Sequence, residues 1–165
     1  MNRFLLIAGL AVVLLGGGLF YLSPAQQGEQ PVKPEDPERV EKAAFNGFDL
    51  SLSAPGETCR LHFENGQVSG DVDLSLPPPC RFMRDAEGRP QFYSENGRQL
   101  IAVVGGVPAE DPIDPLTMRP DCGIGLAGIE FSDGTFTATD YTMGPGVFCA
   151  LMGLEQREIW LLLNG

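Results

Sequence analysis

Residues 48–76, FDLSLSAPGETCRLHFENGQVSGDVDLSL, decide the fold class. Apolar and polar side chains alternate over residues 48–52 and again over residues 61–63. A period of two places successive side chains on opposite faces, which is typical of half-buried β-strands. Asn65-Gly66 follows the second run, and Asn-Gly favours a type I′ turn because both central residues of that turn have positive φ. The stretch therefore predicts antiparallel strands joined by a hairpin.

The same signals recur toward the C-terminus. Asn96-Gly97 precedes residues 100–104, LIAVV, which are apolar at every position and are expected to form a central strand buried on both faces. Asp133-Gly134 separates residues 124–131 from residues 135–141 and predicts another hairpin.

Two further elements are expected at the ends of this region. Asp36 and Pro37 suit an N-cap and a first helical position, so a short helix is predicted over residues 36–44. The closing apolar run at residues 159–163, IWLLL, is expected to form a buried final strand. With 21 Gly and 14 Pro in 165 residues, the pattern predicts a mainly β fold, an antiparallel sandwich or partly open barrel of about eight short strands.

The N-terminus has the pattern of a targeting segment. Arg3 precedes residues 4–22, a run of nineteen residues without a charge. That length favours a retained membrane helix, because the apolar region of a cleaved signal peptide has about 7–15 residues. Gly16-Gly17-Gly18 and Ser23-Pro24-Ala25 are features of a cleaved signal segment, so both outcomes stay open.

The chain is accordingly divided into three parts. Residues 1–25 are expected to be the signal anchor or signal peptide, residues 26–45 a polar, proline-containing spacer with the short helix, and residues 46–165 a disulfide-stapled β domain. The positive-inside rule places the N-terminus in the cytoplasm and the domain on the periplasmic side of an inner membrane. Cleavage of the leader would make the protein periplasmic or secreted.

Charge argues against nucleic acid as a partner. The chain has 11 basic and 22 acidic residues and a net charge of −11. A polyanion would be repelled unless the arginines were gathered on one face, and the sequence scatters them.

Four cysteines follow the leader, in what is expected to be an oxidising compartment. They predict two disulfides, and Cys59–Cys80 with Cys122–Cys149 is the favoured pairing because each pair brackets one hairpin. A metal site is not expected, since the C-x-x-C spacing of zinc ribbons is missing and His62 is the single histidine.

Three patterns bear on catalysis. Residues 123–128 fit G-x-G-x-x-G but lack the preceding strand and following helix of a dinucleotide site, so no cofactor is expected. A hydrolytic triad would have to use His62, which is expected to point outward from a strand. Carboxylate pairs are abundant and carry no sign of an apolar pocket that would raise a pKa. These pairs are Asp71 with Asp73, Glu110 with Asp111 and Asp114, and Glu155 with Glu158.

One basic patch is expected. If Cys59 and Cys80 are bonded, Arg60, Arg81 and Arg84 become neighbours and could bind a small anionic ligand. The loop from Gly105 to Pro120 is a second candidate surface, because long connections are often functional.

The sequence thus favours a non-enzymatic binding or accessory module of the cell envelope, tethered to the membrane, with a protein or a small anionic ligand as partner. An inhibitor or immunity-type protein directed against an envelope enzyme or toxin is the alternative, because a stapled surface loses little entropy on binding. A carboxylate-dependent hydrolase is the second alternative.

Overall fold

The computed structural model describes residues 40–111 and 114–165. This part of the chain is mainly β with antiparallel sheets, which confirms the predicted fold class at that level. The expected leader and most of the expected spacer lie outside the described residues. Neither helix in the described part has the length and hydropathy that crossing a membrane requires.

Three sheets are formed, all by antiparallel pairing. One has four strands in the order β1 (Glu41–Phe45), β2 (Phe48–Ser53), β3 (Arg60–Glu64) and β4 (Ser69–Asp73). The second is built from β5 (Cys80–Phe82), β6 (Phe92–Glu95), β7 (Arg98–Gly105), β9 (Gly125–Ser132) and β10 (Thr135–Met143). The third pairs β8 (Cys122–Gly123) with β11 (Phe148–Cys149). The two helical segments are the 3₁₀ turn η1 (Pro115–Met118) and α1 (Gln156–Asn164).

The described residues thus contain eleven strands, against the eight or so expected from the sequence. Three of the eleven, β5, β8 and β11, have only two or three residues each. A strand that short shows no periodicity, so its pairing is set by the surrounding fold.

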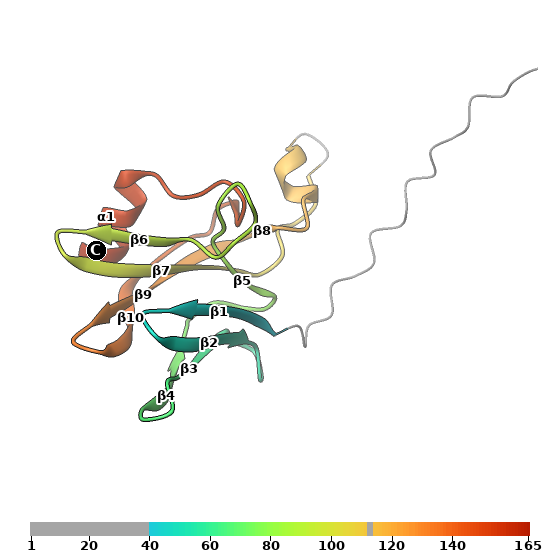
Figure 1. Cartoon of the computed structure of the whole chain (residues 1–165). Coiled ribbons are helices and arrows are strands. Elements are labelled where there is room, and N and C mark those ends of the chain that lie inside the picture. Colours follow the sequence, from blue (N-terminus) through green and yellow to red (C-terminus); the bar gives the residue numbers. More distant parts are fainter. Residues whose placement is uncertain (1–39, 112–113) are drawn as a thin grey trace, which may run out of the picture. The chain divides into compact units, whose positions relative to one another are not determined.

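The elements stack in layers, with the four-stranded sheet below the five-stranded sheet and α1 above (Figure 1). The main core lies between the sheets and includes Leu50, Phe63 and Ile129. A second core lies on the other face of the five-stranded sheet, where Leu162 of α1 packs near Leu100. The two cores explain why β7 is buried on both faces, as its apolar sequence predicted.

Each predicted hairpin is present, but one turn differs from the expectation. Asn96 and Gly97 both have positive φ, and so do Asp133 and Gly134, as a type I′ turn requires. In the hairpin of β3 and β4 only Gly66 has positive φ, and Glu64 pairs with Ser69 around a longer loop. That loop is closed by Asn65, whose backbone N–H donates to the Val68 carbonyl.

Two sequence predictions are wrong. The expected helix over residues 36–44 is replaced by β1 over its described part, because residues 41–45 pair with β2 across Asn46-Gly47, where both residues have positive φ. The expected final strand at residues 159–163 belongs to α1, whose apolar side chains pack on the five-stranded sheet. Glu158 stabilises the start of that helix by accepting the backbone N–H of Glu155 at 2.8 Å.

Candidate functional site

The structure contains two disulfides, and they join Cys59 to Cys80 and Cys122 to Cys149. The first closes the hairpin of β3 and β4 and ties it to β5 of the other sheet. The second closes the hairpin of β9 and β10 through the short β8–β11 pair. One pocket is lined by residues adjacent to three of these four cysteines, namely Arg81, Asp121 and Ala150. The region between the two disulfides is therefore the candidate site.

This pocket has a volume of about 160 Å³ and a charged lining. Its walls are formed by Glu41, Arg81, Arg84, Pro120, Asp121, Ala150 and Leu151. Two of the three predicted arginines therefore meet here. Arg60 does not, because it lies on β3 and its Nε donates to Asp73 on β4 at 2.5 Å.

Arg84 forms an ion pair with a carboxylate of the pocket, and Arg81 lines the same pocket. Arg84 Nη2 lies 2.9 Å from Oε2 of Glu41, whose side chain is only 3 % exposed, and Arg84 Nη1 donates to the Gly88 carbonyl. Arg81 is 8 % exposed. Because Glu41 and Asp121 share the lining with the two arginines, the pocket has no surplus positive charge. An anion entering the pocket would have to compete with these carboxylates. The three arginines are not gathered in one place, and the binding of a small anion stays a prediction.

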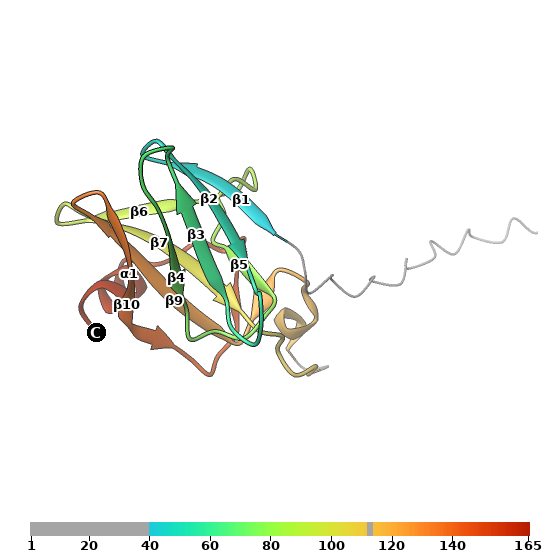
Figure 2. The ribbon, with the colours of Figure 1, turned by 90° about the horizontal axis from the view of Figure 1, so that it is seen from below.

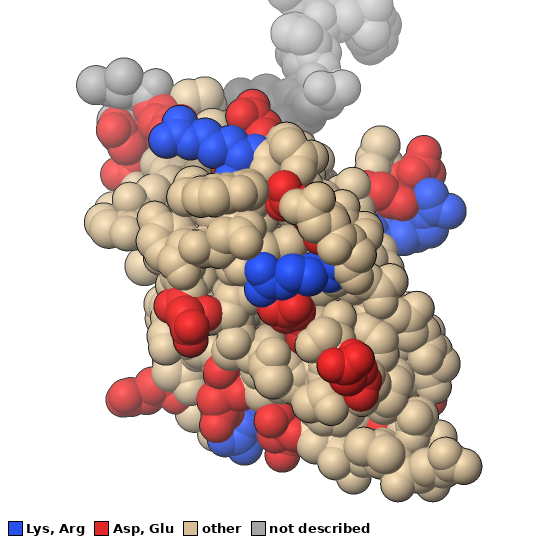
Figure 3. All heavy atoms as spheres, turned by 90° about the vertical axis from the view of Figure 1, so that its left-hand side faces the viewer, with Lys and Arg blue, Asp and Glu red and all other residues tan. Residues whose placement is uncertain are grey.

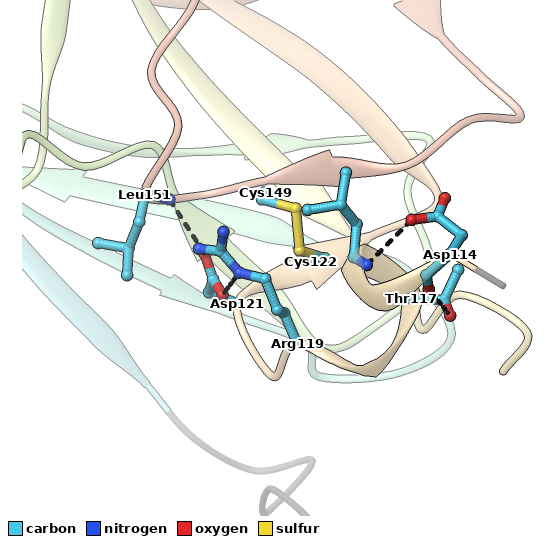
Figure 4. The surroundings of a disulfide bond; sticks show 8 residues. Asp114, Thr117, Arg119, Asp121, Cys122, Cys149 and Leu151 are labelled. Carbon is cyan, nitrogen blue, oxygen red and sulfur yellow. Dashed lines mark hydrogen bonds and ion pairs between the residues drawn. A yellow bond between two sulfur atoms is a disulfide. The ribbon is translucent and has the colours of Figure 1, made fainter. Parts of the chain in front are cut away.

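Asp121 fixes the loop on the other side of the pocket, next to Cys122 (Figure 4). Arg119 donates to both of its carboxylate oxygens, from Nε at 3.0 Å and from Nη2 at 2.7 Å. The backbone N–H of Leu151 donates to the same carboxylate. Burial on its own raises the pKa of Asp121, but the Arg119 guanidinium and the Leu151 N–H outweigh it and hold that pKa below its usual value.

The loop between β11 and α1 presents apolar side chains next to this charged pocket. Leu151 is 48 % exposed and Met152 is 63 % exposed. Leu151 lines the charged pocket, whereas Met152 lines a neighbouring pocket of about 160 Å³ that also contains Glu155 and Glu158. We call Leu151, Met152, Glu155 and Glu158 the loop surface. It combines exposed apolar area with two carboxylates.

The glycine motif has a packing role in the structure. A Cβ atom on Gly123 would lie 2.5 Å from the Gly105 carbonyl oxygen, and one on Gly125 or Gly128 would lie 2.7 Å from a neighbouring side chain. Gly123 lies on β8, Gly125 and Gly128 lie on β9, and the chain after the motif continues as a strand, not as a helix. These contacts explain the spacing of the glycines without a dinucleotide.

The carboxylates that the sequence groups in pairs are engaged by other groups of the chain. Asp71 Oδ1 lies 2.8 Å from His62 Nδ1, whereas Asp73 accepts Arg60. Asp114 caps η1 by accepting the Leu116 N–H, and Glu158 caps α1.

His62 lies on the outer side of β3, as predicted, with 43 % of its side chain exposed. Over residues 40–111 and 114–165, no three His, Cys, Asp or Glu side chains could together hold a metal ion.

Acidic side chains outnumber basic ones, and most of the arginines are paired with carboxylates of the same chain. Several arginines of the described residues form ion pairs with the protein's own carboxylates, among them Arg60, Arg84, Arg89, Arg98 and Arg119. In Figure 3 acidic groups are spread over the visible face, and each basic group lies beside an acidic one. The carboxylates left over give the described part an acidic surface.

Sequence reasoning missed Glu41, Asp121 and Leu151. The signal for Leu151-Met152 was present, as an apolar pair in a glycine-containing connection. No local signal marks Glu41, because its partner Arg84 lies on a segment that only the folded chain brings close. Comparison of the chain with protein-family models, with curated proteins and with solved structures found no significant match.

Proposed function

We propose that this chain is an exported, membrane-tethered binding or accessory module of the cell envelope that docks a basic protein surface. The uncharged run at residues 4–22 supports the export and the tether. Two disulfides support an oxidising compartment.

The loop surface is the observation that carries the proposal. Exposed Leu151 and Met152 supply apolar contact area, and Met is enriched at protein interfaces. Glu155 and Glu158 lie in the same pocket as Met152. A lysine or arginine of a partner suits that pocket, because its apolar stem can pack on Met152 while its cationic end meets the carboxylates.

The balanced charges of the pocket favour a protein over a small anion as partner. Arg84 and Asp121 are already engaged by groups of the chain itself. The remaining carboxylates favour a cationic partner and would accelerate its encounter at low salt.

Affinity capture with the full chain tests the proposal. The tagged protein is solubilised from its membrane, and retained envelope proteins are quantified by mass spectrometry for the native chain, for Leu151→Ser/Met152→Ser, and for Val68→Ser. Val68 is 51 % exposed on the β3–β4 loop and serves as the matched control. We expect a partner with a basic surface whose retention falls at least about tenfold in the double variant, as for a hot-spot pair, and also falls with added salt.

Equal retention by the native chain and the double variant would overturn the choice of surface. A partner that is lost equally from the Val68→Ser variant would show that the loss is not specific to the loop surface. If no envelope protein is retained while the chain turns over a substrate, the binding role itself is wrong.

Inhibition of an envelope enzyme or toxin is the second candidate function. The two disulfides hold both ends of the candidate site, so its surface is preorganised and loses little entropy on binding. In that case the retained partner is itself a hydrolase or toxin, and expression of the native chain, but not of Leu151→Ser/Met152→Ser, protects cells from it.

A further inference from the structure

Three exposed apolar side chains lie at the end of the domain where its first strand begins. They are Val40, Val107 and Met118. Val40 comes directly before β1, Val107 follows the end of β7, and Met118 is the last residue of η1. We call these three residues the apolar end.

The loop that carries two of them is fixed on both sides to the strands around β8. The carbonyl of Gly105, two residues before Val107, accepts the backbone N–H of Ile124 at 2.9 Å. The carbonyl of Arg119, the residue after Met118, accepts a backbone N–H of β8 at 3.2 Å. Val107 and Met118 are therefore held at the same end of the five-stranded sheet.

The start of β1 lies at this end too. Glu41 accepts the Phe82 N–H of β5 and so holds Val40 near that strand. β5 is paired with the last residues of β7, where Cys80 lies opposite Gly105. The loop with η1 and the beginning of β1 both lie at the right-hand end of the domain in Figures 1 and 2.

We infer that the apolar end docks on the lipid surface of the membrane that holds the chain, with zwitterionic headgroups as its preferred lipids. The inference rests on the tether of the proposed function and adds a second contact to it. Residues 23–39, seventeen in all, connect the uncharged run to Val40. A chain of that length spans at most about 60 Å, so the apolar end stays close to the bilayer.

The short connection makes a weak contact sufficient. A single lipid chain gives a protein only marginal affinity for a membrane, and a few apolar side chains give no more. In a tethered protein the contact is intramolecular, with an effective concentration on the order of millimolar. The valine and methionine side chains then leave water for the boundary between headgroups and acyl chains, which is favourable for apolar surface.

Charge determines which lipid suits this end. Glu110 and Asp111 are exposed in the same loop, and Arg119 is paired with Asp121. These carboxylates would repel an anionic headgroup over a Debye length, about 8 Å at physiological ionic strength. A zwitterionic headgroup carries no net charge and avoids that repulsion.

Methionine oxidation in lipid nanodiscs tests the inference on the full chain. Met118 and Met152 are 65 % and 63 % exposed, so hydrogen peroxide should reach both equally unless something covers one of them. With one chain in each phosphatidylcholine disc, the bilayer is the only available cover, and peptide mass spectrometry measures the two rates. We expect Met118 to react about tenfold more slowly than Met152, the ratio for an end that is docked roughly nine-tenths of the time.

Val107→Asp is the disrupting variant, because a charge at this position would have to enter the bilayer. In this variant Met118 and Met152 should react at similar rates. Val68→Asp is the matched control, since Val68 is an exposed valine in the β3–β4 loop, at the other end of its sheet from Val40. It should keep the native ratio of rates. Phosphatidylglycerol discs should reduce the protection of Met118 in the native chain.

Equal oxidation of Met118 and Met152 in the native chain, or protection that survives Val107→Asp, would overturn the docking. Stronger protection in phosphatidylglycerol discs than in phosphatidylcholine discs would overturn the choice of lipid. A chain that enters the discs without protection of Met118 refutes the docking alone. A chain that does not enter the discs refutes the tether, and the docking with it.

Discussion

The carboxylate of Glu41 lies 2.9 Å from Nη2 of Arg84, and this ion pair joins the first strand of one sheet to the segment that follows β5 in the other. The same carboxylate accepts the backbone N–H of Phe82 at 2.9 Å. Glu41 is therefore a buried charge whose partners both come from the opposite layer of the fold.

Replacement of Glu41 by alanine is expected to destabilise the domain strongly. The variant leaves the Phe82 N–H and a mostly buried guanidinium without their acceptor, and removal of one partner of a buried ion pair costs about 3–5 kcal/mol. Urea denaturation measures the change in free energy of unfolding. Glu57→Ala is the control, since Glu57 is exposed and its loss should change stability by less than about 0.5 kcal/mol. Equal effects of the two variants would contradict this role for Glu41.

Loss of either disulfide is expected to lower stability by about 3 kcal/mol in the chain-entropy model. The bonded cysteines are separated by 21 and 27 residues, so the two losses should be similar. The paired variants Cys59→Ala/Cys80→Ala and Cys122→Ala/Cys149→Ala are compared with the native chain by urea denaturation. Thiol titration of the unfolded, unreduced native protein should find no free cysteine, and four free thiols would contradict the pairing.

The contribution of Asp121 to stability should depend on pH. Its pKa is lowered in the folded state, so its stabilising effect is complete above the unfolded pKa, near 3.9, and is lost as the pH falls through the lower folded value. We expect Asp121→Asn to cost about 1.5–3 kcal/mol at pH 7, as for hydrogen bonds to a charged group. The difference should shrink below about pH 4. Unfolding measured from pH 2.5 to 7 checks this, with the exposed Asp140→Asn as a control whose curve should follow that of the native chain.

Gly123→Ala is expected to destabilise the β8–β11 region by about 1–3 kcal/mol, because the new methyl group would overpack it. The carbonyl oxygen of Gly105 would lie 2.5 Å from that methyl carbon, and it belongs to the backbone of the central sheet and cannot rotate away. Gly56→Ala is the control, since nothing lies within 4 Å of its Cβ position. Thermal unfolding of both variants is the measurement, and a tolerated Gly123→Ala would show that the glycine motif is not explained by packing.

The local sequence pattern was sufficient to predict the strands that are buried on one face only and joined by short turns. Alternation identified β2 and β3 because one face of that sheet is buried and the other exposed. It failed at residues 41–45, where two adjacent alanines fit a helix as well as a strand and Asn46-Gly47 was the decisive signal. It failed again at residues 159–163, since a short apolar run does not distinguish a buried strand from a buried helix. There the Glu155 and Glu158 spacing was the signal that a helix begins.

The candidate site was predictable only in part, because its residues are far apart in the sequence and come together only in the folded chain. Pairing of the cysteines brought Arg81 into the expected neighbourhood, but strand alternation turned Arg60 to the outer face toward Asp73.

The positions of the two disulfides have a mechanical consequence for a chain attached at its N-terminal side. The covalent loops enclose residues 59–80 and 122–149, so β1 and β2 lie outside both. A pulling force applied from that side would reach β1 first, where the ladder with β2 and the bonds of Glu41 resist it without any covalent reinforcement. If the chain is tethered as proposed, the edge formed by β1 would therefore open first under load, while the hairpins closed by disulfides stay intact.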